Sequence, residues 1–309
     1  MRRCAVLLWV ALATVATWPP VDAAADPAAV RSVIEAIVNN DDSVLGASVS
    51  AVDGTGFRMD AAASTGFSRT DEQQRMAPNI AVRAGTVGEL LLACVVIQLQ
   101  SEGVLPQADE GIPSRLLPGG SLTYVNPNFP GQPLTIRMLL THTSSLQDPL
   151  RFDQNPALVA SGSTAQSLQA FGIDFFTTTA STGSATRSVR PDLWTTDQPG
   201  VDSSYRFARV NIALLAYVVQ LAMADRPQLA TIPTVGALIQ ERILTRLGMT
   251  STYFMLPDGR TPFVQAGLAT LGSTKQVEPS AFQIHAAYVA DYMCLTSSAD
   301  LVKLANALF

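Results

Sequence analysis

Residues 135–146 read TIRMLLTHTSSL, and residues 76–89 read MAPNIAVRAGTVGE. In the first string, apolar residues recur at the spacing of one helix face, which predicts a short helix over 134–140. The second string runs into a segment from Thr86 to Glu102 that is apolar nearly all round, which is typical of a buried helix. Gly103 then occupies the place expected of a helix C-terminal glycine.

Three shorter strings follow further along the chain. They are Pro199-Gly200 with Ala-Leu-Leu at 213–215, QERILTRLGM at 240–249, and TSSADL at 296–301. Their periodicity predicts helices over 212–224, over 235–247 with Gly248 at its end, and over 298–309 with Ser298 as its cap. The Pro- and Gly-rich stretch 105–133 is expected to be mostly loop, 150–198 to be an insertion of loops and short helices, and 257–290 to be irregular.

The N-terminal part of the chain predicts helix, strand, turn and strand. Asp26-Pro27 is typical of a helix start. Residues 46–52 predict a strand, 53–56 a Gly-rich turn, and 57–62 the returning strand.

Together these strings resemble the serine β-lactamase and penicillin-binding-protein superfamily, in its class C and esterase-like branch. Residues 76–89 follow the pattern M-T-P-D-T-x-F-R-I-G-S-V-T-K without a gap, and 135–146 follow T-I-R-H-L-L-T-H-T-S-G-L. The other strings match P-G…A-L-L-G, L-G-M and S-T-A-x-D-L in the same order. The resemblance implies an α/β (α+β) fold of the β-lactamase/transpeptidase type, with an antiparallel sheet flanked by helices and a helical domain.

The resemblance also implies four site positions. The family transfers acyl groups with a Ser nucleophile, a Lys one helical turn later, a Tyr-x-Asn loop, and a strand carrying K-T-G or H-T-G. Here Thr86 takes the place of the Ser, Glu89 that of the Lys, and Phe207 and Arg209 those of the Tyr and Asn. A carboxylate replaces the amine base, and Phe has no proton to shuttle. We therefore expect these residues to be degenerate and catalytically inactive.

The same residues also admit structural roles or a surviving activity. Thr86 and Glu89 have the spacing of a capping box, in which each side chain bonds the other residue's backbone amide. The alternative is that Glu89 acts as a general base for Thr86, and Tyr205 would replace Phe207 only if the loop shifted. His142 is structural in the family. Arg209 either binds an anionic ligand or pairs with Glu89.

The C-terminal region predicts an incomplete sheet. Neither Lys-Thr-Gly nor His-Thr-Gly occurs in the sequence, and Phe309 follows the TSSADL helix directly. We expect the C-terminal sheet strands to be missing, and exposed strand edges to favour self-association. Three hypotheses follow: a secreted, non-catalytic β-lactamase-related protein, an active serine/threonine-type hydrolase with unusual residues, or a truncated gene product without independent function.

The first 23 residues have the order of a secretory signal peptide. Arg2 and Arg3 precede an apolar run from Cys4 to Ala16, and a small-residue pattern ends at Ala23. We expect residues 24–309 to form the mature β-lactamase-related domain, exported from the cell. A mitochondrial presequence is the alternative. The apolar run is too short to span a bilayer, and no later segment is long and apolar enough.

Composition narrows the remaining function classes. The chain has 309 residues, is 48% hydrophobic and carries a net charge of -5 without a run of Lys or Arg. This balance argues against nucleic acid as a partner. With only His142 and His285 as histidines, we expect no His-rich metal site and no cofactor. Cys94 and Cys294 lie in apolar contexts and are interpreted as buried thiols, with a disulfide as the alternative. The sequence identifies no ligand or protein partner.

Overall fold

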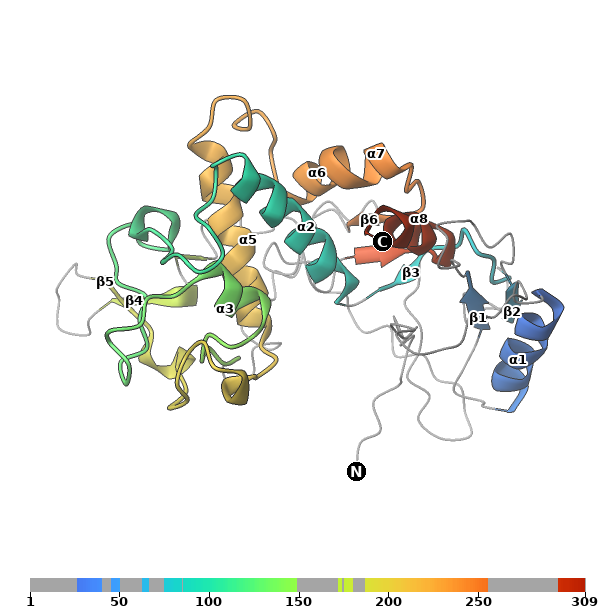
Figure 1. Ribbon diagram of the computed structural model, residues 1–309, viewed down its shortest axis with the longest axis horizontal. Helices are drawn as coiled ribbons and strands as arrows, with labels where there is room; N and C mark the ends of the chain where they lie inside the picture. The colour runs from blue at the N-terminus through green and yellow to red at the C-terminus, as the bar shows by residue number, and fades with distance from the viewer. Residues whose placement is uncertain are drawn as a thin grey trace.

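The computed structural model describes residues 27–40, 46–50, 63–66, 75–84, 86–148, 172–173, 175–179, 187–254 and 294–308. The predicted signal peptide, the turn and strand at 53–62, and most of 150–186 and 257–290 lie outside these residues. The described chain is elongated, with α1, β1 and β2 near one end and α3, β4 and β5 near the other (Figure 1). None of the helices within the described ranges has the length and apolar character required to traverse a bilayer.

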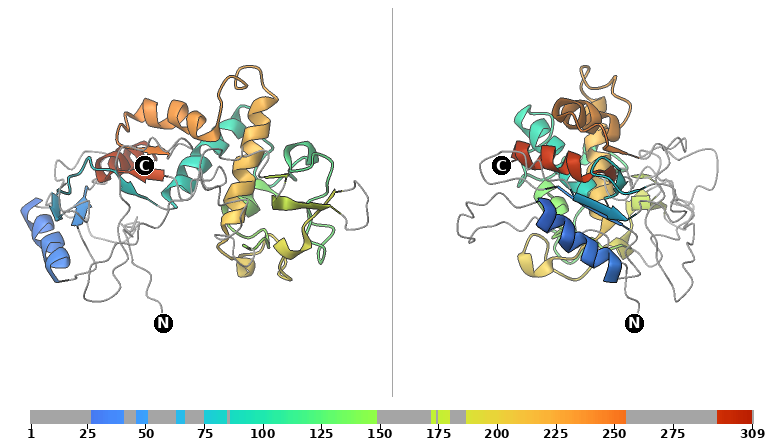
Figure 2. Two further views of the ribbon diagram at one scale, coloured as in Figure 1. Left: turned by 180° about the vertical axis from the view of Figure 1, so that it is seen from behind. Right: turned by 90° about the vertical axis from the view of Figure 1, so that its right-hand side faces the viewer.

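A helical part forms the main core around α5 (Arg209–Ala224). This helix is buried along most of its length because its sequence, RVNIALLAYVVQLAMA, is apolar on nearly every face. It contacts α2 (Val87–Ser101), α3 (Ile136–Leu140) and α6 (Val235–Ile239). A π-helical turn, η5 (Gln240–Leu244), and α7 (Thr245–Leu247) continue α6. Figure 2 shows α2 and α5 meeting in the middle of the molecule.

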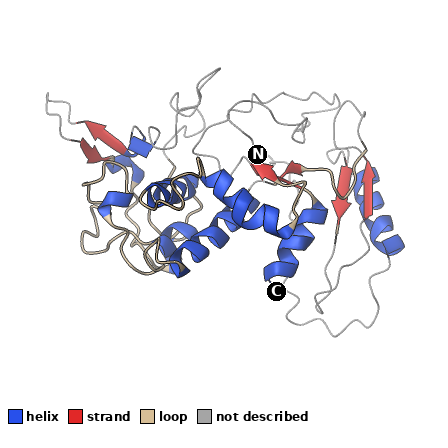
Figure 3. Ribbon diagram, turned by 90° about the horizontal axis from the view of Figure 1, so that it is seen from above, coloured by secondary structure: helices blue, strands red, loops and turns tan. Residues whose placement is uncertain are grey.

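The strands form three small antiparallel sheets within the described residues. One pairs β1 (Gly46–Val49) with β2 (Ala63–Gly66), and α1 (Pro27–Asn40) packs on this pair. A second places β7 (Cys294–Thr296) between β3 (Val82–Arg83) and β6 (Tyr253–Phe254). The third pairs β4 (Thr177–Thr179) with β5 (Arg187–Val189). Figure 3 shows α1 alongside the β1–β2 pair.

The last helix connects the N-terminal unit to the rest of the chain. It is α8 (Ser298–Leu308), and the Ser298 hydroxyl lies 2.8 Å from Ser48 Oγ and 2.9 Å from Ser50 Oγ. Ser298 was expected to cap this helix. The cap is Ser297 instead, whose Oγ accepts from the Asp300 amide at 3.2 Å, because the helix begins at Ser298 itself.

The predicted helices are confirmed, with small shifts at their ends. Gly103 and Gly248 adopt φ of 67° and 64°, the left-handed geometry that ends a helix after α2 and α7. One side chain departs from the expectation of complete burial: Ile97 of α2 is 62% exposed. Cys94 is half-buried and Cys294 buried, and both are free thiols.

Candidate functional site

The predicted site lies where three segments meet near the start of α2. Thr86 and Glu89 come from the first turn of that helix, and His142 from the turn after α3. Phe207 and Arg209 come from the loop that leads into α5 and from its first residue. The structure brings Glu89, His142 and Phe207 together around one imidazole ring, as their hydrogen bond and ring contact show.

The predicted capping box does not form. Thr86 precedes α2 with helical dihedrals, φ −69° and ψ 0°, and its side chain makes no capping hydrogen bond. A capping residue normally adopts extended dihedrals, which aim its oxygen at the amides of the first turn. The Glu89 amide donates to the Thr86 carbonyl at 3.0 Å instead. The Glu89 carboxylate is therefore free to point away from the backbone.

That carboxylate bonds His142. Glu89 Oε2 lies 3.2 Å from His142 Nε2, and the two side chains are only 16% and 7% exposed. The pairing of Glu89 with Arg209, one of the two alternatives for Arg209, is not observed, and within the described residues His142 is the ion-pair partner of Glu89. Each ring nitrogen of a histidine can carry one proton and donate one hydrogen bond. The groups that face Nδ1, on the side of the ring away from Glu89, therefore show which nitrogen carries the proton.

The far side of the imidazole faces two hydrogen-bond donors. His142 Nδ1 lies 3.4 Å from the Ala208 amide nitrogen and 3.2 Å from Asn211 Nδ2. A backbone amide can only donate, so Nδ1 accepts and the ring proton is on Nε2. His142 is thus the neutral tautomer that donates to Glu89. The assignment follows from this pattern of donors and acceptors.

His142 is also held by its backbone and by two aromatic rings. Its φ is 54°, unusual for a residue with a side chain, and its carbonyl accepts from the Arg206 amide at 3.0 Å. The Phe207 ring centroid lies 4.9 Å from that of His142, and the Tyr205 ring meets it edge-on at 6.3 Å. Both ring nitrogens are occupied by hydrogen bonds, which supports the structural interpretation of this histidine.

Asn211 extends the polar network, and the sequence interpretation missed it. Its Oδ1 accepts from the Ser144 hydroxyl at 2.5 Å, so Ser144, Asn211, His142 and Glu89 form one connected chain of hydrogen bonds. Asn211 is fully buried. A lone amide in the apolar sequence of α5 was the available signal, since buried polar groups are nearly always hydrogen-bonded.

The positions that the resemblance assigns to the family Tyr and Asn are occupied by Phe207 and Arg209. Phe207 is 43% exposed and has no hydroxyl, and the Tyr205 ring, 63% exposed, lies further from His142. The backbone amides of Arg209 and Val210 donate to the two carboxylate oxygens of Asp148, at 3.1 and 2.9 Å. Asp148 therefore satisfies the first turn of α5, where a carboxylate also suits the helix dipole.

One oxygen of the Glu89 carboxylate lacks a hydrogen-bond partner within the described residues. It is Oε1, which is buried. Within the described residues, no three His, Cys, Asp or Glu side chains lie close enough together to hold a metal ion. Thr86 is exposed, and the carboxylate one turn later is committed to His142. The residue one turn after Thr86 is thus a carboxylate and not an amine, and Phe207 brings no phenol to the imidazole, whereas the Tyr205 ring lies edge-on to it at 6.3 Å.

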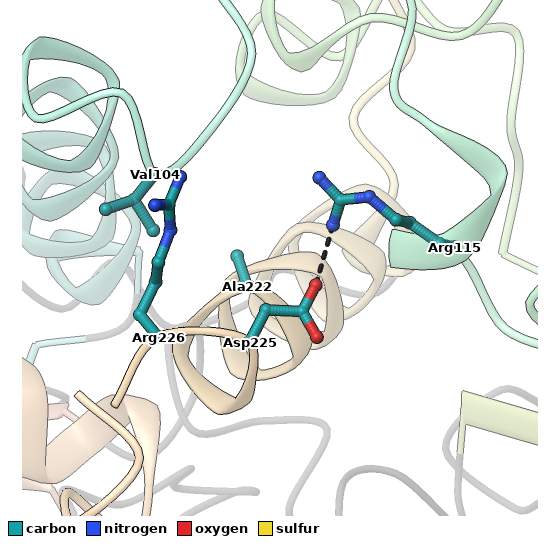
Figure 4. Close-up of a pocket in the computed structure, with 5 residues that line it drawn as sticks. All are labelled: Val104, Arg115, Ala222, Asp225 and Arg226. Atoms are coloured by element: carbon teal, nitrogen blue, oxygen red, sulfur yellow. Dashed lines mark hydrogen bonds and ion pairs between the residues drawn. The ribbon is translucent and has the colours of Figure 1, made fainter. Parts of the chain in front are cut away.

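A surface hollow lies at the opposite end of α5. It measures about 270 Å³ and is lined by Val104, Arg115, Ala222, Asp225 and Arg226. Arg115 Nη1 bonds Asp225 Oδ2 at 2.7 Å across it, and Arg226 projects from the other side (Figure 4). Arg226 also donates to the Gly103 carbonyl at 2.7 Å. The hollow sits at the C-terminal end of α5, whereas Phe207 and Arg209 sit at its start, so it is separate from the predicted site.

Comparison with known proteins gives one family. A family model described as Beta-lactamase matches residues 29–308. No curated protein matches the sequence. Among solved structures, an octameric penicillin-binding protein homologue from Pyrococcus abyssi is similar with a TM-score of 0.62 and 19% identity, over 91% of this chain and 56% of that one.

Two further structures share the fold. A D-amino acid amidase from Ochrobactrum anthropi SV3, complexed with L-phenylalanine amide, has a TM-score of 0.59 and 17% identity, over 91% of this chain and 69% of that one. A beta-lactamase/D-alanine carboxypeptidase from Yersinia pestis, complexed with citrate, has a TM-score of 0.55 and 16% identity, over 91% and 68%. The chain spans little more than half the length of the Pyrococcus abyssi protein.

Proposed function

The chain belongs to the beta-lactamase family, and from this premise we propose that it is a secreted, non-catalytic member that binds a ligand without hydrolysing it. The observation that carries the proposal is the Glu89–His142 hydrogen bond at the position of the family's base. A base must be within hydrogen-bond reach of the proton that it removes. Glu89 is turned toward a ring that donates to it, away from that task.

The other site positions support the same proposal. Phe207 offers no proton, and its ring packs on His142 in the place where a phenol would act. Catalytic groups of this kind work as a unit, so that losing several leaves little beyond binding effects. One general base alone is worth about 10²- to 10⁴-fold in rate.

The test is a set of hydrolysis assays on the purified chain. We expect no turnover of a chromogenic cephalosporin, a D-alanyl peptide or a nitrophenyl ester. We also expect no covalent labelling of Thr86 by a penicillin or a fluorophosphonate. Thr86→Ala is the matched control, because it removes the only hydroxyl at the nucleophile position. Turnover that disappears in this variant would favour an active hydrolase with unusual residues.

Export is a separate part of the proposal. The charged, apolar and small-residue order of residues 1–23 is the support for it. N-terminal sequencing of exported material should begin within a residue or two of Ala24. Recovery of a chain that begins at Met1 inside the cell would contradict export, and recovery from mitochondria would favour the presequence alternative.

Self-association is proposed on weaker support. Among the described strands, β1 and β2 pair only with each other, and two-stranded sheets are marginal by themselves. One structural neighbour is described as octameric. Light scattering on the protein as it elutes from a size-exclusion column measures its molar mass directly. A monodisperse monomer would rule out self-association.

A further inference from the structure

The buried carboxylate of Glu89 is incompletely satisfied. Oε2 accepts from His142, while Oε1 is buried and has no hydrogen-bond partner in the part of the chain that the structure describes. An orphaned buried acceptor is costly, and in native proteins it usually marks a group or solvent molecule that completes the site. The missing component must therefore be a hydrogen-bond donor.

The charge of Glu89 is not neutralised by its partner. His142 Nδ1 accepts from the Ala208 amide, so the ring is neutral and the pair carries one net negative charge. Within the described residues His142 is the ion-pair partner of Glu89, and the Arg206 guanidinium pairs with Asp197 at 3.7 Å. A donor that also carries a positive charge would both hydrogen-bond Glu89 Oε1 and balance the negative charge of the carboxylate. Hydrogen bonds between charged groups are also stronger than those between neutral ones.

Exposed aromatic rings pack on the imidazole that bonds this carboxylate. Phe207 and Tyr205 both pack on the imidazole that holds Glu89, and they are 43% and 63% exposed. Aromatic faces attract organic cations and cover the carbon atoms attached to them. Both rings lie in the loop before α5, and 16% of the Glu89 side chain is exposed.

We propose that Glu89, Phe207 and Tyr205 bind a primary organic ammonium group. Its N–H donates to Glu89 Oε1, and its carbon skeleton lies against the two rings. A primary amine is required because a quaternary ammonium has no N–H to offer the vacant oxygen. This ligand class belongs to the non-catalytic site proposed above, and the inference rests on that proposal. At this site a carboxylate that receives a cation takes the place of the base for acyl transfer.

The test is a calorimetric titration of the full chain at neutral pH. The probes are 2-phenylethylammonium, its trimethylated analogue, and 3-phenylpropionate as an anion of similar shape. We expect the primary amine to bind, the trimethylated amine to bind at least about tenfold more weakly, and the anion not to bind. Equal binding of the amine and the anion, or no binding of the amine, would overturn the inference.

Two variants assign the binding to this site. Glu89→Gln keeps an oxygen that accepts from His142 but removes the charge, and it should weaken amine binding by about tenfold or more. Glu110→Gln, an exposed glutamate beyond the other end of α2, is the matched control and should bind as wild type does. Melting curves check that both variants are folded. Wild-type affinity in Glu89→Gln would overturn the inference.

The probes contain no cleavable bond, so the result is independent of hydrolysis. Turnover of an ester together with amine binding would overturn the non-catalytic proposal alone. Absence of both turnover and amine binding would overturn the ammonium inference alone.

Discussion

Glu89 illustrates how one substitution changes the role of its neighbours. A Lys at this position would place an ammonium donor opposite His142 Nε2, which already carries a proton. The carboxylate converts that contact into a hydrogen bond, and it also suits the positive end of the α2 dipole. The pairing could not be predicted from the sequence, because Glu89 and His142 are joined only by the packing of α2 against the turn after α3. Local spacing favoured the capping box instead.

Restoring the family's pair of residues should therefore destabilise the protein. In Glu89→Lys an ammonium faces the Nε2 proton in a nearly buried site, and we expect a loss of about 2–4 kcal/mol in unfolding free energy. Thr86→Ser should cost little, because the Thr86 side chain makes no capping bond. Urea unfolding of the two single variants and the double variant measures both effects.

The same experiment contains its control. Glu89→Gln retains an acceptor for His142 and should lose about 1 kcal/mol or less. A Glu89→Lys variant as stable as wild type would show that the His142 contact contributes nothing. Neither single variant, nor Thr86→Ser with Glu89→Lys, should gain hydrolytic activity, since Phe207 still lacks a hydroxyl.

The two free thiols should differ in reactivity. Burial raises the pKa of Cys294 to about 12, and burial also raises the pKa of Cys94, which is only half-buried. A raised pKa favours the unreactive thiol, so at pH 8 the thiolate fraction of Cys294 is on the order of 10⁻⁴. We expect iodoacetamide to modify Cys94 before Cys294 in the folded chain.

Peptide mapping by mass spectrometry distinguishes the two cysteines. Labelling in urea is the control, and both should react there at similar rates. Preferential modification of Cys294 in the folded chain would contradict its burial against β3 and β6. Isolation of a peptide joined through Cys94 and Cys294 would contradict the free thiols.

At the scale of elements, helices were predictable and strands less so. The apolar run of 212–224 predicts α5, and Gly103 and Gly248 predict where α2 and α7 end, in each case to within a few residues. These helices are predictable because the residues that signal a helix lie within one turn of each other. The strand expected at 46–52 is β1 (Gly46–Val49), but its described partner, β2 (Ala63–Gly66), begins one residue after the expected return strand. Sheet pairing depends on distant residues and on turn length, which local patterns do not contain.

The glycine after α7 offers a test of helix termination. Gly248 has φ 64°, and a Cβ added there would meet no atom within 4 Å. Gly248→Ala should therefore cause no steric clash and should lower the unfolding free energy by about 1 kcal/mol, because alanine disfavours the left-handed backbone conformation. Gly131→Ala is the matched control, since it also opens onto free space but without a positive φ. Urea unfolding of both variants decides the matter, and equal stability of the two would contradict the account.

At the scale of the whole molecule, the N-terminal unit is held less firmly than the helical core. Within the described residues, Ile34 of α1 is buried but lies outside the main core cluster, while Val33 and Ile37 are 60% and 50% exposed. The unit of α1, β1 and β2 is joined to α8 through the hydroxyls of Ser48, Ser50 and Ser298. In contrast, α5 is covered by α2, α3 and α6.

Stability should accordingly be uneven along the chain. Elements with few buried side chains open locally at lower free energy than a helix surrounded by other helices. We expect amides of residues 27–40 to exchange with deuterium at least about tenfold faster than those of 209–224, measured by mass spectrometry on peptides of the native protein. Ser298→Ala removes the hydroxyl that Ser48 of β1 and the following Ser50 contact, and it should speed exchange in α1 and β1 while leaving α5 unchanged. Ser114→Ala, in the 3₁₀ turn Ser114–Leu116, is a control that should change neither region. Equal protection of α1 and α5 from exchange would mean that the two parts unfold as one cooperative unit. In that case the serine contacts would not determine how readily α1 opens.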